Sequence, residues 1–238
     1  MLKILTVIAI FIVPFVAAAS AQNKPPAAET KPTAPQTPKK TNQRPNAKAA
    51  KATPTDPFEK ATVETMAAQC VKLDTEAGGV ELEMFPESAP ESVRGFLNLA
   101  ATKALDTTTF NRVVPGFIIQ GGDLGTHEKY SHELARRAAK TLPDEPSAIK
   151  HERGILSMAR AAEPNTATTG FFILVGTATH LDGTFAAFGR VVRGMETVDA
   201  INKAPVEGEK PKKPVRINRA SVAACAAGDK TVSIFIDK

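Results

Sequence analysis

Two short apolar runs that meet at a Pro-Gly dipeptide constrain the fold of this chain most strongly. Residues 110–114 and 117–119 flank Pro115-Gly116, and a Pro-Gly pair between two such runs is typical of a hairpin. Arg112 lies in the first run among mostly apolar and glycine neighbours. Arginine is seldom buried without a partner. Arg112 therefore either serves a site or lies at a strand end with its head group in water.

Alternating and helical patterns continue on both sides of this hairpin. Residues 70–75 and 80–85 each alternate apolar with polar side chains around Gly78-Gly79, which predicts a second hairpin. Pro90 suits a first helical position, and apolar residues follow it at helical spacing. Further strands are expected at residues 154–159, 171–175, 184–192, 215–222 and 231–236, and short helices at 132–140 and 194–202. Many short strands with separated helices predict a mostly antiparallel barrel or sandwich.

The first 21 residues have the pattern of a secretory signal peptide. Lys3 precedes an apolar run over residues 4–17, and an Ala-Ser-Ala motif ends at Ala21. The apolar run is close to bilayer-spanning length, so an uncleaved membrane anchor is the alternative. Pro14 and the small-residue exit favour cleavage. We therefore expect an exported protein, periplasmic or secreted, with no stable membrane insertion after cleavage.

Residues 22–57 differ in composition from the rest of the chain. They contain eight of the 18 prolines, and no aromatic residue precedes Phe58 except within the apolar start. Such a segment has little to bury, so a disordered Pro-, Lys- and Ala-rich linker is expected, followed by one domain over residues 58–238. The linker carries a charge of +5, whereas residues 58–238 carry −1. The basic charge of the chain therefore belongs to the linker, and the domain itself is close to neutral. We expect the domain to have no nucleic-acid partner and to be a monomer.

Several common catalytic patterns are missing from the sequence. The four histidines lack the spacing of metal ligands. Ser157 is not part of a Gly-x-Ser-x-Gly elbow, and Gly121-Gly122-Asp123 lacks the spacing of a phosphate-binding loop. An enzyme with this sequence is therefore expected to work without a metal, another cofactor or a covalent intermediate. The histidines are His127, His132, His151 and His180.

The two cysteines suggest a disulfide, because the protein is expected to be exported. Cys70 begins the first predicted strand, and Cys225 follows a late one. Antiparallel pairing of these strands would bring the two thiols together. A bridge over so long a loop contributes about 4–5 kcal/mol on the chain-entropy model. Two unpaired, small hydrophobic side chains are the alternative.

Three motifs together identify a family resemblance. Residues 110–123 are similar to the Phe-His-Arg, Pro-Gly-Phe and Gln-Gly-Gly-Asp signature of cyclophilin-type peptidyl-prolyl isomerases. Residues 157–173 resemble the second signature of that family, and residues 181–192 its third. The similarity extends over about residues 71–222, nearly the whole predicted domain. It implies a closed eight-stranded antiparallel β-barrel capped by two α-helices.

The resemblance also implies a reaction. Rotation about an X-Pro bond is slow because it breaks amide resonance, with a barrier of about 18–20 kcal/mol. Arg112 would be the catalytic residue, since its charged fork of donors can favour a pyramidal proline nitrogen. Other residues would hold a proline-containing unfolded or flexible polypeptide in an apolar socket and the groove beside it. These substrate-binding residues would be Phe117, Ile118, Gln120, Ala159, Arg160, Phe172 and Leu181.

The chain departs from the family pattern at four positions on the rim of the implied site. The family usually has His at the position of Asn111 and Gln at that of Gly170. It has Trp or another large group at the position of His180, and often His at that of Phe185. Gly170 removes a side chain expected to support Arg112. Two functions remain open: an isomerase that assists the folding of exported proteins, and a binding module or chaperone for proline segments with little turnover. Both need Arg112 and the socket, and they differ in catalysis.

Overall fold

A computed structural model describes residues 56–226. The predicted signal peptide, the predicted linker up to residue 55 and the predicted strand at 231–236 lie outside the described residues. The helices are α1 (Val63–Ala67), α2 (Pro90–Ala101), α3 (His132–Ala139) and α4 (Met195–Asn202), with 3-10 turns η1 (Leu124–Thr126) and η2 (Thr179–Leu181). The strands are β1 (Gln69–Thr75), β2 (Gly78–Met84), β3 (Arg112–Val114), β4 (Ile118–Gly121), β5 (Ile155–Met158), β6 (Phe171–Leu174), β7 (Ala187–Arg193), β8 (Val206–Glu207), β9 (Lys210–Pro211) and β10 (Ile217–Ala224).

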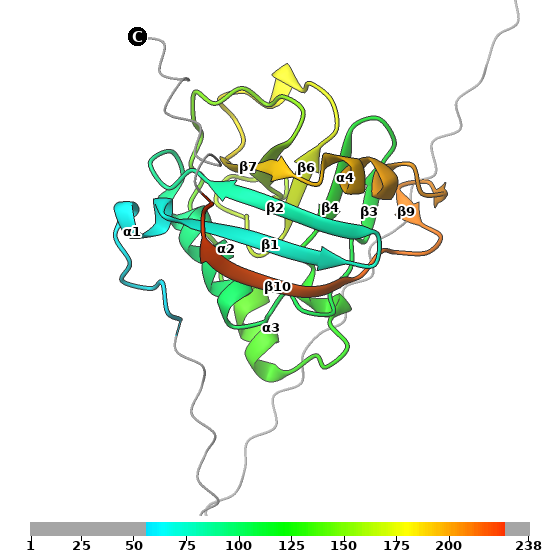
Figure 1. The fold of residues 1–238 in the computed structure, drawn as a ribbon. Helices are drawn as coiled ribbons and strands as arrows, with labels where there is room; N and C mark the ends of the chain where they lie inside the picture. The colour runs from blue at the N-terminus through cyan, green and yellow to red at the C-terminus, as the bar shows by residue number, and fades with distance from the viewer. Residues whose placement is uncertain (1–55, 227–238) are drawn as a thin grey trace, which may run out of the picture. The chain divides into compact units, whose positions relative to one another are not determined.

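Eight of these strands form one antiparallel sheet. Its order is β10-β1-β2-β7-β5-β6-β4-β3, and β8 and β9 form a separate small hairpin. The sheet curls, so that β10, β1 and β2 run across the strands β6, β4 and β3 in Figure 1. The predicted mostly β architecture and both predicted hairpins are therefore confirmed.

The barrel is not closed, which corrects the predicted closed eight-stranded barrel. The two ends of the sheet, β10 and β3, do not pair along their lengths. Only the segment before β3 reaches β10, where Thr107 N–H donates to the Ile217 carbonyl at 2.7 Å and Ile217 N–H to the Thr108 carbonyl at 2.8 Å. The free edge of β3 is occupied instead, because Val113 N–H donates to the carbonyl of Glu209 at 2.8 Å. The hairpin of β8 and β9 thus takes the place that β10 would need for closure.

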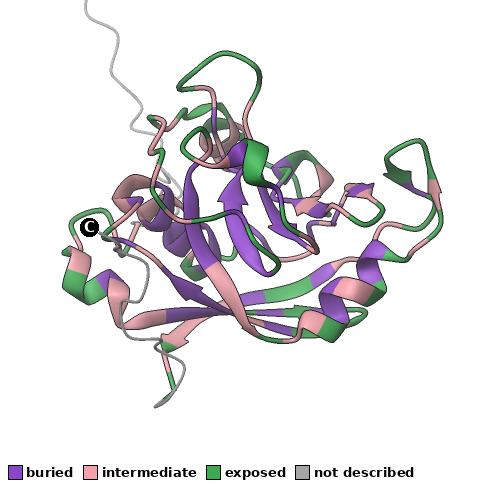
Figure 2. Cartoon of the chain, turned by 90° about the horizontal axis from the view of Figure 1, so that it is seen from above, coloured by how far each residue is buried: buried purple, intermediate pink, exposed green. Residues whose placement is uncertain are grey.

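The strands in the middle of the sheet are buried on both faces. All four residues of β6 are buried, and those of β5 as well. Side chains alternate between the faces of a strand, so Phe171 and Ile173 enter the main core while Phe172 and Leu174 enter a second, smaller apolar cluster. Figure 2 shows these central strands as the most continuously buried part of the fold. The second cluster includes several of the residues predicted to bind substrate.

Two helices complete the main core, as predicted. Helix α2 contributes Phe96, whose ring meets those of Phe171 and Phe188 edge to face, with centroids 5.1 and 5.3 Å apart. Helix α4 contributes Val198 and Ile201, which belong to the same core. The structure adds α1, which was not predicted, and confirms the predicted short helix at α3. Strand β7 begins later than predicted, because residues 181–185 form a turn with Thr184 and Phe185 N–H donating to the Leu181 carbonyl.

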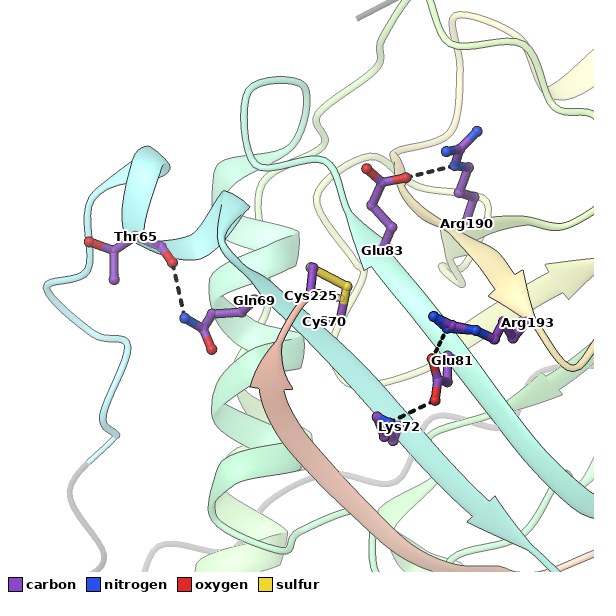
Figure 3. Close-up of a disulfide and its surroundings, with 9 residues drawn as sticks. All are labelled: Thr65, Gln69, Cys70, Lys72, Glu81, Glu83, Arg190, Arg193 and Cys225. Carbon is purple, nitrogen blue, oxygen red and sulfur yellow. Dashed lines mark hydrogen bonds and ion pairs between the residues drawn. A yellow bond between two sulfur atoms is a disulfide. The ribbon is translucent and has the colours of Figure 1, made fainter. Parts of the chain in front are cut away.

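The predicted disulfide joins Cys70 and Cys225. Gln69 of β1 is paired with Ala224 of β10, so the cysteine that follows β10 lies beside the start of β1. The two Cα atoms are 4.9 Å apart across a sequence separation of 155. Figure 3 shows the bridge at the end of this strand pair, near a row of ion pairs that runs across β1, β2 and β7.

Candidate active site

One row of paired residues crosses four strands and places unlike side chains on the same face of the sheet. Arg112 of β3 is paired with Gln120 of β4, which is paired with Phe172 of β6. Phe172 is paired in turn with Ser157 of β5. Directly opposed residues of neighbouring strands share a face. The row therefore brings together a cation, an amide, an aromatic ring and a hydroxyl, of which only the cation and the amide come from the same hairpin.

The apolar residues predicted to form the socket gather around this row. The second apolar cluster contains Ile118, Phe172 and Leu181, and Phe117, Ala159 and Phe185 pack against it. It is separate from the main core. Its strand residues lie on the face of the sheet opposite those of the main core, which is the face of Gln120 and Phe172.

The guanidinium of Arg112 has two side-chain partners. Its Nη1 donates to Oε1 of Gln120 at 3.0 Å, and its Nε donates to Oε2 of Glu209 at 2.6 Å. Glu209 lies in the turn between β8 and β9 and was not predicted from the sequence. No periodicity or motif marks it, because it is 97 residues from Arg112 and exposed. The side chain of Arg112 remains 40% exposed, so it is available at the edge of the socket.

Two rim residues make ring contacts with the socket. The ring of His180 lies 5.7 Å from that of Phe117, and the ring of Phe185 lies 6.1 Å from that of Phe172. The guanidinium of Arg160 is stacked over Phe185, with its Cζ 4.7 Å from the ring centroid. The predicted rim positions His180 and Phe185 are therefore adjacent to the socket.

Of the remaining predicted residues, Ala159 and Arg160 follow β5, and Gly170 directly precedes β6. Gly170 lies against Ala159, whose N–H donates to the Gly170 carbonyl at 3.0 Å. A Cβ at Gly170 would meet the Cβ of Ala159 at 3.4 Å, so the position has room for a side chain. Nη1 of Arg160 donates to the carbonyls of residues 161 and 162, both at 3.0 Å. Asn111 bonds a residue outside the predicted site, because its Nδ2 donates to Oδ2 of Asp123 at 3.1 Å.

Helix α4 fixes the hairpin that carries Arg112. The buried amide of Asn202 accepts a hydrogen bond from Gly116 N–H at 2.8 Å. Its Nδ2 donates to the carbonyls of Val114 and Ile118 at 3.0 and 2.9 Å. One side chain thus satisfies three backbone groups of the β3–β4 turn, where Gly116 has a positive φ of 74°. The turn geometry that sets the register of Arg112 is therefore held from outside the hairpin.

The segment at residues 124–150 supports the site from the other side. The carboxylate of Glu145 accepts hydrogen bonds from the N–H groups of Glu91 and Ser92, both at 2.8 Å, at the N-terminus of α2. This carboxylate caps the N-terminus of α2, because Ala89 at the N-cap position has no side-chain acceptor. Asp144, the preceding residue, lies 3.5 Å from Nε of Arg160. The segment therefore links the start of α2 to Arg160.

A buried serine and a buried histidine meet a half-buried aspartate, an arrangement that the sequence did not predict. Nε2 of His151 lies 3.1 Å from Oγ of Ser157, and Nδ1 lies 3.2 Å from Oδ1 of Asp182. Asp182 also accepts from His151 N–H at 2.8 Å. The order of contacts is that of a hydrolase triad, but Ser157 is 0% exposed and His151 is 1% exposed. No substrate carbonyl can reach this hydroxyl, so the three residues anchor the segment that carries Leu181.

Burial also determines the protonation of this histidine. Desolvation lowers the pKa of His151, although the hydrogen bond and charge of Asp182 act in the opposite direction. In the neutral form Nδ1 carries the hydrogen, because the carboxylate can only accept. The hydroxyl of Ser157 then donates to Nε2 or to the carbonyl of Ala186, which is 2.9 Å away.

Residues 56–226 contain neither a metal-binding cluster nor a membrane-spanning helix. No three His, Cys, Asp or Glu side chains come together there in a group that could hold a metal ion. Over the same residues, no helix combines the length and apolar character needed to cross a membrane.

Comparison with known proteins assigns the family. A family model described as cyclophilin type peptidyl-prolyl cis-trans isomerase/CLD matches residues 70–222. The chain belongs to the cyclophilin family. The resemblance seen in the three motifs is therefore confirmed, and this cyclophilin is an enzyme of the peptidyl-prolyl cis-trans isomerase class.

Relatives from distant organisms agree with this assignment. A peptidyl-prolyl cis-trans isomerase of Arabidopsis thaliana is 36% identical over 157 residues, which are 65% of this chain and 96% of the plant protein. A peptidyl-prolyl cis-trans isomerase of Acinetobacter baylyi is 34% identical and is covered over 84% of its length by 64% of this chain. A Cryptosporidium parvum cyclophilin, solved in the presence of the dipeptide Ala-Pro, superposes with a TM-score of 0.58 at 31% identity, covering 66% of this chain and 99% of that one.

The histidine anchor gives this cyclophilin a predicted pH dependence of stability. Unfolded histidine takes up its proton near pH 6.5, whereas His151 in the fold does so only at lower pH. The unfolded state therefore binds more protons in that interval, and stability falls as pH falls below about 6.5, by at most about 1.4 kcal/mol per pH unit. The free energy of unfolding, measured by urea titration at several pH values between 7.5 and 5, should change less with pH for His151→Gln than for wild type. The exposed His132→Gln serves as the control, and equal slopes for wild type and His151→Gln would contradict the prediction.

Proposed function

We propose that this cyclophilin accelerates X-Pro isomerisation in exported polypeptides, with Arg112 as the catalytic residue. The observation that carries the proposal is the row in which Arg112, Gln120 and Phe172 share one face of the sheet. Support comes from a charged, partly exposed donor on the same face as an apolar cluster that is separate from the main core. A proline needs both surfaces, because its ring is apolar and its amide is polar.

The chemistry requires no bond cleavage. Amide resonance withdraws electron density from the proline nitrogen, and rotation becomes easier when the nitrogen turns pyramidal. A fixed donor near the nitrogen and its carbonyl stabilises that geometry more than the planar ground state, which is the condition for catalysis. Arg112 supplies such a donor through the planar fork of N–H groups on its guanidinium.

The socket sets the substrate class that we propose. Phe117, Ile118, Phe172 and Leu181 would enclose the pyrrolidine ring, since all four belong to or pack against the second apolar cluster. Gln120 would then hydrogen-bond the substrate backbone while it also accepts from Arg112. Flexible or unfolded proline-containing segments fit this site, because an X-Pro bond within packed structure could not enter it.

We also propose that the protein is exported and acts in the periplasm or outside the cell. Two features support this proposal: the signal-peptide pattern of residues 1–21, and a disulfide between the two cysteines, which persists in oxidising compartments. N-terminal sequencing of the mature protein from a periplasmic or extracellular fraction checks it. A start at Gln22 supports cleavage, and recovery of the intact N-terminus in the cytoplasm contradicts export.

The test of the activity is catalysis by the purified protein. Isomerisation of a proline-containing tetrapeptide is followed at 10 °C, where the uncatalysed reaction takes minutes. We expect acceleration that is proportional to enzyme concentration. Binding of the same peptide without any acceleration would favour the alternative, a proline-segment binding module or chaperone on the same fold.

A further inference from the structure

The turn between β8 and β9 carries a carboxylate to the edge of the site. Gly208 has a positive φ of 62° and allows the tight reversal that leads into Glu209. The backbone of Glu209 is fixed to the site, because its carbonyl accepts from Val113 N–H at 2.8 Å. Val113 is the immediate neighbour of Arg112 on β3. The side chain of Glu209 therefore starts from a position set by the same strand that carries the arginine.

The carboxylate and an amide hold the guanidinium at two different nitrogens. Oε2 of Glu209 lies 2.6 Å from Nε of Arg112, and Oε1 of Gln120 lies 3.0 Å from Nη1. Within residues 56–226, Nη2 of Arg112 makes no hydrogen bond. The hydrogen bond and charge of Arg112 lower the pKa of Glu209, so its carboxylate is ionised at neutral pH.

We propose that Glu209 is a positioning residue for Arg112: it fixes the plane of the guanidinium so that Nη2 is presented to the substrate amide. The inference rests on the proposed function of Arg112. A partly exposed arginine without anchors samples many rotamers, and a donor that must be ordered during the reaction stabilises the transition state less. Bonds at Nε and Nη1 define the plane of the rigid fork, and the position of Nη2 follows from that plane.

The pair is suited to positioning rather than to holding the fold together. The side chains of Arg112 and Glu209 are 40% and 54% exposed, and exposed ion pairs contribute little to stability. Variants of Glu209 should therefore fold as wild type does. The opposite role is also testable: a carboxylate that competes with the substrate for the guanidinium would slow the enzyme, and its removal would then raise activity.

The test compares Glu209→Ala, Glu209→Gln and Glu207→Ala in the full-length protein. Glu207 is an exposed carboxylate in the same hairpin and serves as the matched control. We expect Glu209→Ala to lower kcat/KM about five- to tenfold, through kcat, with peptide affinity unchanged. Glu209→Gln should stay within about twofold of wild type, because its amide oxygen still accepts from Nε. Glu207→Ala should match wild type.

A second measurement does not depend on turnover. The Nε–Hε NMR signal of Arg112 should exchange slowly with water in wild type and in Glu209→Gln, and rapidly in Glu209→Ala. An active wild type together with an equally active or faster Glu209→Ala would overturn the positioning role. An inactive wild type would refute the proposed function instead, and the NMR signal would still report whether Glu209 orders the arginine.

Discussion

Replacing Arg112 with alanine should lower kcat/KM for a prolyl peptide by about 10²–10³, the usual loss when one donor to the reacting group is removed. The side chain is partly exposed and is not part of either apolar cluster, so the variant should keep its fold. Gln120 and Phe172 remain in their strands, because their backbone pairing does not depend on the arginine. Peptide binding should therefore weaken far less than catalysis. A protease-coupled or NMR exchange assay, paired with peptide titration, measures the two effects separately.

Arg112→Lys is the informative control for this result. Lysine keeps the charge but replaces the planar fork with a compact ammonium group, whose geometry cannot bond Glu209 and Gln120 in the same way. We expect it to recover no more than about tenfold of the activity lost in Arg112→Ala. Two observations would contradict the proposal: Arg112→Ala with the activity of wild type, or Arg112→Lys with full activity, which would reduce the role of the arginine to its charge.

Removal of the disulfide should have the second large effect, on stability. The double variant Cys70→Ala/Cys225→Ala should lose about 2–5 kcal/mol of unfolding free energy, because the bridge closes a very long loop and restricts the unfolded chain. For a domain of this size the loss corresponds to about 5–15 °C in Tm. Activity at low temperature should be unchanged. Cys70 lies on β1, near one end of the strand order, and the proposed catalytic residue lies on β3, at the other end.

Reduction of wild type provides the matched control for the double variant. A reductant should lower the Tm of wild type to about that of the variant, and it should leave the variant unaffected. This comparison separates the loss of the bridge from any loss of packing at Cys70, which is almost fully buried. A wild-type Tm that does not respond to complete reduction, verified by titration of two thiols, would show that the bridge does not stabilise the fold.

Local patterns predicted the parts of the site that are close in sequence. The Pro-Gly turn predicted the hairpin of Arg112, and β3 and β4 pair across it as expected. The family motifs predicted the socket, and the structure gathers Phe117, Ile118, Phe172 and Leu181 in one cluster. Two side-chain contacts between distant segments were missed. Neither the meeting of His151 with Asp182 nor that of Arg112 with Glu209 follows a periodicity, because each joins single residues of separate loops or strands.

The sequence by itself determined most elements of the fold, the disulfide between its two cysteines and the family to which the chain belongs. These depend on short-range rules of alternation, turn residues and motif spacing, which a single sequence displays. Only the tertiary structure decided which element lies along the free edge of β3. Unpaired backbone N–H and C=O groups at a strand edge can form hydrogen bonds with any segment of suitable geometry. Here the turn at Glu209 lies along that edge instead of β10. The same choice leaves the barrel open and places a carboxylate beside Arg112.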